Sequence, residues 1–145
     1  TWFSGDIAYF KTIRLPAKVV FATRIAAGHN FGEYEFYQAQ ILDGNSDLRG
    51  YRKTRFAGDS RVFNNTELRI GLFNFNNPIV PATIGLSVFN DVGRVWVEGE
   101  KSDKWHHGYG AGIWIAPLNA IVLSVDFATS EEEDLLAYLK LGFRF

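Results

Sequence analysis

The sequence predicts an all-β fold, an antiparallel β-barrel that spans a membrane. Segments of about ten residues repeatedly place aliphatic and aromatic side chains on one face and Gly, Ser, Thr or single charges on the other. The connections between these segments are alternately short and longer, which is typical of barrels with tight turns at one membrane surface and loops at the other. Together these two regularities indicate lipid on one face of each strand and a crowded, wet lumen on the other.

The composition is compatible with this fold and excludes several others. The 145 residues suffice for one domain, 1–145. Aromatic residues make up 16% of the chain, yet no apolar run approaches the roughly 18 residues of a membrane-spanning helix. There is no Cys, which excludes disulfides, thiolate metal sites and a cysteine nucleophile. A net charge of -1 gives no general attraction to nucleic acid.

The first two strands are expected at 6–15 and 18–27, separated by Pro16. In the second, the alternation puts Arg24 on the small, polar face. A long Gly-containing connection, 28–60, follows. A connection of this length is uncommon in a compact domain and is usually functional, so we expect it to fold into the barrel as an irregular loop.

Five further strands follow the long loop, and their alternation is clearer. They are expected at 61–72, 82–97, 107–116, 121–128 and 136–145, with polar loops at 98–106 and 130–134. A soluble sandwich would carry a coat of Lys and Glu on the polar faces, where this chain has Gly and Ser, so a membrane barrel is favoured.

Seven strands would leave two open edges, which a membrane does not tolerate, and single-chain bacterial barrels have even strand numbers. Either an eighth strand lies near 1–4, or the chain is a processed or partial product of a larger barrel.

Two stretches resemble signatures of a known family. Leu48-Arg49-Gly50-Tyr51, in the long loop, is similar to the Arg-Gly-aromatic motif in the sixth external loop of the BamA/TamA superfamily (surface antigen family), which comprises outer-membrane assembly factors and two-partner secretion transporters. Phe89-Asn90-Asp91-Val92-Gly93 is similar to its Phe-x-Asp-x-Gly motif on a late strand. The order of the motifs and the terminal Phe145 agree over nearly the whole chain. The resemblance implies a sixteen-stranded barrel, of which this chain would be roughly the last seven strands.

An Arg that a loop carries into a barrel needs acidic partners, because an unpaired buried charge is costly. The alternation places Asp91 and Glu67 on the lumenal faces of two neighbouring strands, so both are candidate acceptors for Arg49, and the resemblance implies the Asp91 contact in particular. The alternative is a simple surface turn with a solvated Arg49. The predicted loop-docking residues are Arg49, Gly50, Tyr51, Glu67, Phe89, Asp91 and Gly93.

The last strand is the candidate assembly signal, recognised by β-augmentation, and one side of a lateral seam. The usual signal has Gly five residues before the final aromatic residue, whereas Lys140 stands there in this chain. The candidate residues of this strand are Tyr138, Lys140, Gly142, Phe143 and Phe145.

The resemblance implies a bacterial outer-membrane barrel that inserts or translocates polypeptides. Its expected partners are outer-membrane lipid, polypeptide clients, periplasmic or lipoprotein assembly partners, and the remaining strands and N-terminal domains of its own chain. Two alternatives stay open: an anchor or exporter for a soluble, possibly enzymatic N-terminal domain, and a small autonomous barrel that binds an apolar ligand.

We expect no enzymatic activity, cofactor or metal in this segment. His106 and His107 are adjacent on a strand edge and have no third ligand at a suitable spacing. Ser60 has no base placed to activate it. The acidic run 130–134 is interpreted as a solvated loop.

Overall fold

A computed structural model of the chain describes residues 1–14, 18–32, 35–78, 80–99, 103–118 and 121–143. Within them, one seven-stranded sheet is formed by β1 (Trp2–Arg14), β2 (Lys18–Asn30), β5 (Ser60–Phe75), β6 (Ala82–Trp96), β7 (His106–Pro117), β8 (Ile121–Ser130) and β9 (Leu136–Phe143).

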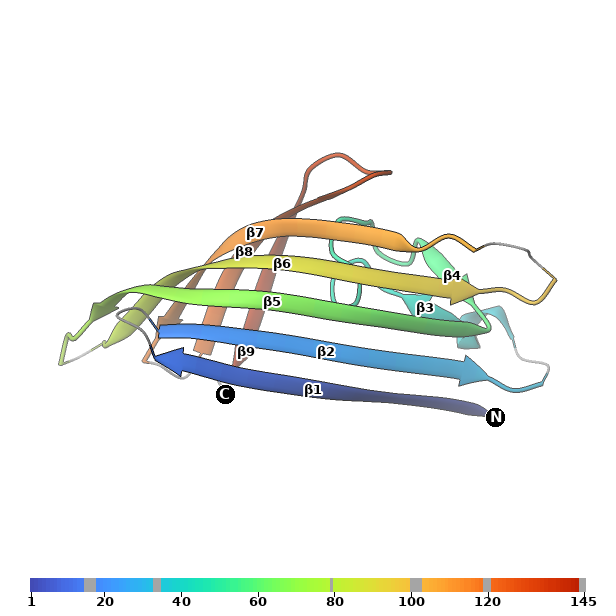
Figure 1. The fold of residues 1–145 in the computed structure, drawn as a ribbon, viewed down its shortest axis with the longest axis horizontal. Helices are drawn as coiled ribbons and strands as arrows, with labels where there is room; N and C mark the ends of the chain where they lie inside the picture. Colours follow the sequence, from blue (N-terminus) through green and yellow to red (C-terminus); the bar gives the residue numbers. More distant parts are fainter. Residues whose placement is uncertain (15–17, 33–34, 79, 100–102, 119–120, 144–145) are drawn as a thin grey trace.

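Every pair of neighbouring strands in this sheet is antiparallel, and the spatial order β1-β2-β5-β6-β7-β8-β9 follows the chain (Figure 1). In the described part of the chain, β1 and β9 each pair on one side only, so the sheet is open. The predicted fold class, an antiparallel barrel segment of seven strands, is confirmed.

Several predicted boundaries were wrong. The first strand begins at Trp2 rather than Asp6, so residues 2–4 extend this strand instead of forming an eighth. β2 continues to Asn30 because its last residues still pair with β1, which shortens the long loop at its start. That loop is also less irregular than expected. It contains the short strands β3 (Gln40–Leu42) and β4 (Phe56–Gly58), which pair with each other, and a 3₁₀ turn, η1 (Phe36–Gln38).

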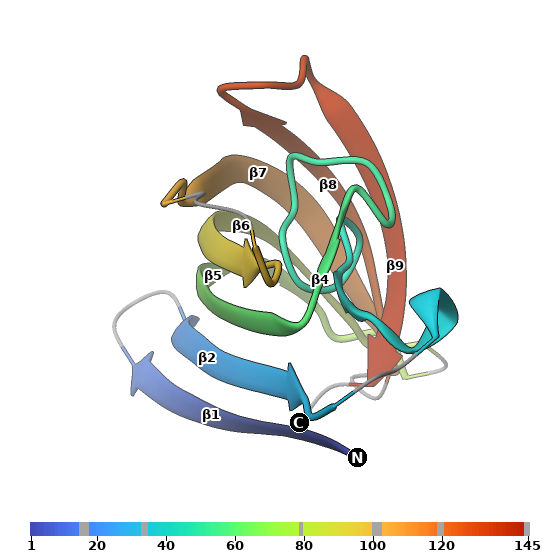
Figure 2. The same cartoon turned by 90° about the vertical axis from the view of Figure 1, so that its right-hand side faces the viewer.

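The sheet curls so that its two faces have different surroundings. Figure 2 shows β1 to β9 bending around the long loop, which lies on the concave side. The outward, convex face carries exposed apolar side chains such as Ile7, Ile113 and Leu139. The concave face, called the inner face below, carries small and polar residues such as Ser87 and Asp126, which are buried. No helix in the described residues is long and apolar enough to cross a membrane.

Candidate functional site

The candidate site is the docked part of the long loop, on the inner face. Leu42, Leu48 and Tyr51 are fully buried there, and they pack with Ala26 of β2 and Phe63 of β5. Gly93 gives this packing its space, because a Cβ at that position would lie 2.7 Å from Cδ2 of Leu42. Apolar packing alone therefore holds the loop against the wall of the barrel, which is the inner face of the seven-stranded sheet.

The approach to the motif is a tight turn held by Asp47. Its backbone N–H donates to the Asp43 carbonyl at 2.9 Å, and its carboxylate accepts a hydrogen bond of 2.8 Å from Arg61 Nη1. The Asp47 carbonyl also accepts from Asn65 Nδ2 at 2.8 Å. Two side chains of β5 thus set the position of the residue two places before Arg49.

Arg49 is the centre of the site. Its guanidinium makes two hydrogen bonds to the Asp91 carboxylate, from Nε at 2.7 Å and from Nη2 at 2.9 Å, while Nη1 donates to Glu67 at 2.6 Å. The Arg49 backbone N–H donates to Asp91 as well, at 3.1 Å. The guanidinium carbon lies 3.5 Å from the centre of the Phe89 ring, a cation–π contact. Arg49 is 4% exposed and Asp91 0%. Water therefore contributes little to stabilising either charge, and each is stabilised by its partner.

A wider set of charges surrounds this pair. Asp126 of β8 lies 3.7 Å from Arg49 Nη1 and 3.6 Å from Lys140 Nζ of β9, and Glu67 also pairs with Arg69. The network therefore contains the carboxylates of Glu67, Asp91 and Asp126, and the cations of Arg49, Arg69 and Lys140. Three charges of each sign balance, which lowers the cost of burying Arg49, Asp91 and Asp126.

Gly50 is required by the close approach of the loop to the wall. Its φ of +98° lies in a region that favours glycine. A Cβ at this position would lie 2.6 Å from the carbonyl oxygen of Thr129. Gly108 is its counterpart in the wall, since a Cβ there would meet the Arg49 carbonyl oxygen at 1.6 Å. Only two glycines facing each other permit this contact.

Tyr138 of β9 connects the loop to the last strand. Its hydroxyl accepts a hydrogen bond from the Gly50 backbone N–H at 3.0 Å and donates one to the Tyr51 carbonyl at 2.8 Å. The hydroxyl thereby satisfies two backbone groups of a loop segment that is shut off from water.

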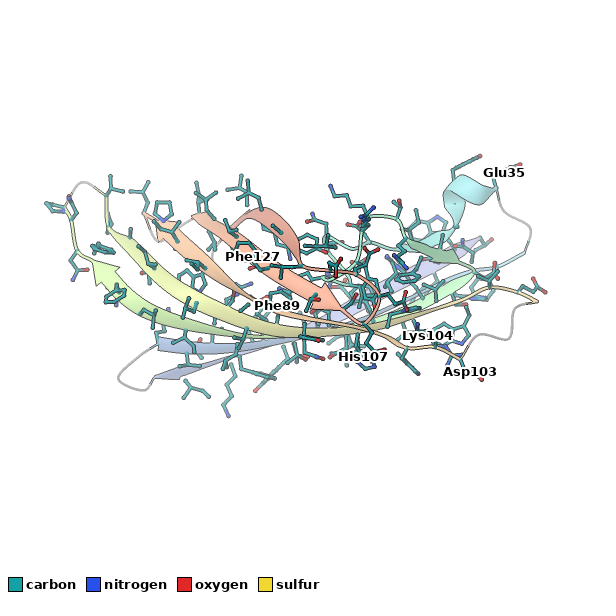
Figure 3. The ribbon with its side chains drawn as sticks, turned by 90° about the horizontal axis from the view of Figure 1, so that it is seen from above. Glu35, Phe89, Asp103, Lys104, His107 and Phe127 are labelled. Carbon is teal, nitrogen blue, oxygen red and sulfur yellow. The ribbon has the colours of Figure 1, made fainter. Side chains whose placement is uncertain are left out.

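A second cluster, the rim cluster, ties the loop to two neighbouring loops at the end of the sheet. Arg55 pairs with Glu132, at 3.1 Å, and with Glu133. Lys104 and His106 also pair with Glu132. Figure 3 shows Lys104, Asp103 and Glu35 at the same end of the sheet. The hydrogen bond from Lys104 holds the pKa of Glu132 below its usual value.

An aromatic stack lies beside the rim cluster. The rings of Phe56 and His106 stack at 3.9 Å, and Tyr51 meets both edge-on. Burial raises the pKa of the Tyr51 hydroxyl, whose proton points to the His107 carbonyl at 3.4 Å. The motif tyrosine therefore belongs to the core of the loop and also to the contact with β7.

The structure brings all seven predicted loop-docking residues to one place on the inner face. The residues predicted for the last strand are arranged differently. Tyr138 points inward and contacts the loop, and Lys140 points inward and contacts its charge network. Gly142 and Phe143 are the last two residues of β9, and Phe145 lies outside the described residues.

Three parts of the site were not predicted from the sequence. They are Asp126, the hydrogen bonds between Tyr138 and the loop backbone, and the rim cluster. Asp126 shares the lumenal side of its strand in the alternation, which is the signal that could have found it. The acidic run 130–134 was interpreted wrongly as merely solvated, because its partners Arg55 and Lys104 come from two other loops.

Comparison with protein families supplies the decisive observation: the Omp85 superfamily domain matches residues 1–145, the whole chain. The chain belongs to the Omp85 superfamily. Comparisons with curated proteins and with solved structures returned no match. Proteins of the Omp85 superfamily reside in outer membranes and serve the assembly or translocation of proteins there, so the open sheet is part of such a barrel. Among the described residues, no group of His, Asp or Glu is arranged to hold a metal ion.

Proposed function

We propose that this chain is the C-terminal part of a BamA/TamA-type barrel of the bacterial outer membrane, which inserts or translocates polypeptide clients. The observation that carries the proposal is the docking of Arg49 between Asp91 and Glu67, with the backbone of the motif bonded to Tyr138 of β9.

The contacts suggest a mechanical role for the loop. Arg49 joins the loop to β5 and β6, and Tyr138 joins it to the strand at the open edge. A loop held in this way keeps the curvature of the wall constant while the edge of β9 opens or closes. The clients would pass at that edge, in contact with lipid and with periplasmic or lipoprotein partners, and this segment would perform no catalysis.

The test uses the full-length protein in its native membrane, with Arg49→Ala. We expect a folded barrel with the usual heat-modifiable mobility, faster cleavage of the loop by trypsin at the exposed Arg52 and Lys53, and reduced client insertion. The matched control is Arg24→Ala, another inner-face arginine, which pairs with Asp6 in an exposed position.

Unchanged client insertion with an undocked loop would contradict the proposal. That result would favour the alternative of a barrel that only anchors or exports another domain, because an anchor needs a folded wall and no docked loop.

A further inference from the structure

β9 lies next to the long loop (Figure 2), and its inner face is held by a different kind of contact at each of three successive inward positions. Leu136 packs against a small apolar cluster of inward side chains. Two residues later, the Tyr138 hydroxyl is hydrogen-bonded to the loop backbone. After two more residues, Lys140 Nζ lies 3.6 Å from a carboxylate oxygen of Asp126 on β8. The strand is therefore held first by packing, then by hydrogen bonds, and last by an ion pair.

The ion pair of Lys140 runs diagonally between the strands, toward the loop. The residue directly opposite Lys140 on β8 is Ser124, whereas Asp126 lies opposite Tyr138. A diagonal neighbour on the same face of a sheet is within reach of a long side chain. The Asp126 side chain is 5% exposed and that of Lys140 is 29% exposed. Water and salt in the lumen therefore still reach the ammonium group, so salt can weaken this pair.

Asp126 is the residue through which the last strand meets the charge network of the loop. Its Oδ2 atom lies 3.6 Å from Lys140 Nζ and 3.7 Å from Arg49 Nη1, and both distances are too long for a good hydrogen bond. Its Oδ1 atom accepts a hydrogen bond of 3.5 Å from Ser87. Arg49 makes its shorter hydrogen bonds to two other carboxylates. Loss of the Lys140 charge should therefore release β9 while the loop stays docked.

We propose that Lys140 is a positioning residue that sets the orientation of the last strand at the seam, by linking β9 to Asp126 and through it to the charge network of the loop. This ionic link accounts for the lysine at the position where the usual assembly signal has glycine, because glycine has no side chain to make it. The inference deepens the proposed function and rests on it in one respect, namely that clients pass at the edge of β9.

The ionic link predicts which part of β9 moves when the link is lost. Residues near Tyr138 keep their packing and hydrogen bonds to the loop. The inward position after Lys140 is Gly142, where an added Cβ would have no atom of the described residues within 4 Å. Displacement should therefore be confined to the end of the strand from Lys140 onward. Ala137 and Leu141 are exposed, outward-facing positions in the two parts of β9, so labels there leave the inner contacts intact.

The experiment measures distances between two spin labels in the full-length protein, in lipid nanodiscs and without clients. One label replaces Val88 on β6, which is outward-facing and exposed, and the other replaces Leu141 or, as an internal control, Ala137. Lys140→Met keeps the length of the side chain and removes its charge. In this variant the fraction of molecules with a second, displaced Val88–Leu141 distance should rise about fivefold, as expected for the loss of one partly exposed ion pair. The Val88–Ala137 distances should not change.

Two matched variants separate the ionic link from a general loss of structure. Lys140→Arg keeps a cation within reach of Asp126 and should retain the wild-type distances. Lys18→Met removes another lysine of the sheet, on β2 and several strands away from β9, and should also leave the distances unchanged. Trypsin should cleave the loop at Arg52 and Lys53 as slowly in Lys140→Met as in the wild type, because the loop stays docked.

A salt titration tests the link with Lys140 in place. Raising salt from about 0.05 M to about 1 M screens the ion pair, so the displaced fraction should increase in the wild type and stay constant in Lys140→Met. The proposal is overturned by an unchanged displaced fraction in Lys140→Met, by equal displacement at Ala137, or by a Lys140→Arg variant that behaves like Lys140→Met. These distances are measured without clients, so failure here is distinguishable from failure of the proposed function.

Discussion

Arg49 makes a set of contacts that only an arginine side chain can make. Its planar fork makes two parallel hydrogen bonds to Asp91, a third to Glu67, and a face contact with Phe89. A lysine has one charged nitrogen on a flexible stem, so it can keep the charge but not this set of contacts. The residue type is therefore dictated by geometry as well as by charge.

Arg49→Lys should consequently fail to restore the docked loop. We expect trypsin to cleave the loop at a rate close to that of Arg49→Ala, because the second hydrogen bond to Asp91 and the stacking on Phe89 are both lost. Wild-type resistance of the lysine variant to cleavage would show that charge alone holds the loop.

Gly50→Ala tests the space between loop and wall. The added Cβ meets the Thr129 carbonyl at 2.6 Å, so the loop should be displaced and cleaved faster while the barrel stays folded. Gly32→Ala is the matched control in the same loop, since Gly32 also has a positive φ, of +74°, but no atom within 4 Å of the added Cβ. If both variants behave alike, backbone strain rather than lack of space explains the Gly50 requirement.

At the scale of elements, the loop and β9 share Tyr138. Tyr138→Phe keeps the ring and removes the hydroxyl that serves two backbone groups of the loop. The loss should cost about 1–3 kcal/mol, the usual penalty for a buried polar group left without a partner. We expect faster hydrogen exchange at the Gly50 amide and along β9. Tyr109→Phe, on the exposed outward face, should leave the exchange of both segments unchanged.

The rim cluster makes the loop sensitive to acid. The pKa of Glu132 is lowered from 4.5 in the folded protein, chiefly by the hydrogen bond from Lys104. A lowered pKa means that the carboxylate stabilises the docked state above pH 4.5 and loses this effect as the pH falls below that value. A spin label at Lys53→Cys should therefore become more mobile below about pH 4.5. Glu132→Gln should remove this transition and Glu131→Gln, at an exposed position, should not.

A strand could be predicted well where the alternation of outward and inward residues continues along its whole length. The alternation from Ile84 to Val92 sets the faces of β6, and the same period puts Glu67 and Asp91 on one side of adjacent strands. The interior of the long loop could not be predicted in this way. β3 and β4 are three residues each, too short for a periodic signal, and they form because Leu42 and Phe56 pack against the wall.

The same limit explains the missed parts of the site. Tyr138 contacts Tyr51, which is 87 positions away in the chain, and Glu132 contacts Arg55, which is 77 positions away. A pattern within one short stretch of sequence cannot predict such contacts. Arg49 and Asp91 were accessible to prediction because each belongs to a recognisable motif.

At the scale of the whole molecule, the sheet separates two environments. Its outward face is mostly apolar, and its inner face carries the charge network around Arg49. Val125→Lys places a cation on the outward face and should destabilise the inserted barrel by about 2–4 kcal/mol, as expected for lysine at the middle of a bilayer. Ser124→Lys, one residue away on the inner face next to Asp126, should have a much smaller effect on urea unfolding in lipid. Equal losses would contradict the assignment of the two faces.

The docking of the loop by a buried ion pair is the central claim, and a double-mutant cycle tests it most directly. The loop cleavage rate of Arg49→Ala, Asp91→Ala and the double variant is compared with that of the wild type. If the two side chains stabilise the docked loop through each other, the double variant should be no worse than the more damaging single variant, with a coupling energy of about 1–3 kcal/mol. Effects that simply add would show that Arg49 and Asp91 act separately, and would contradict the claim.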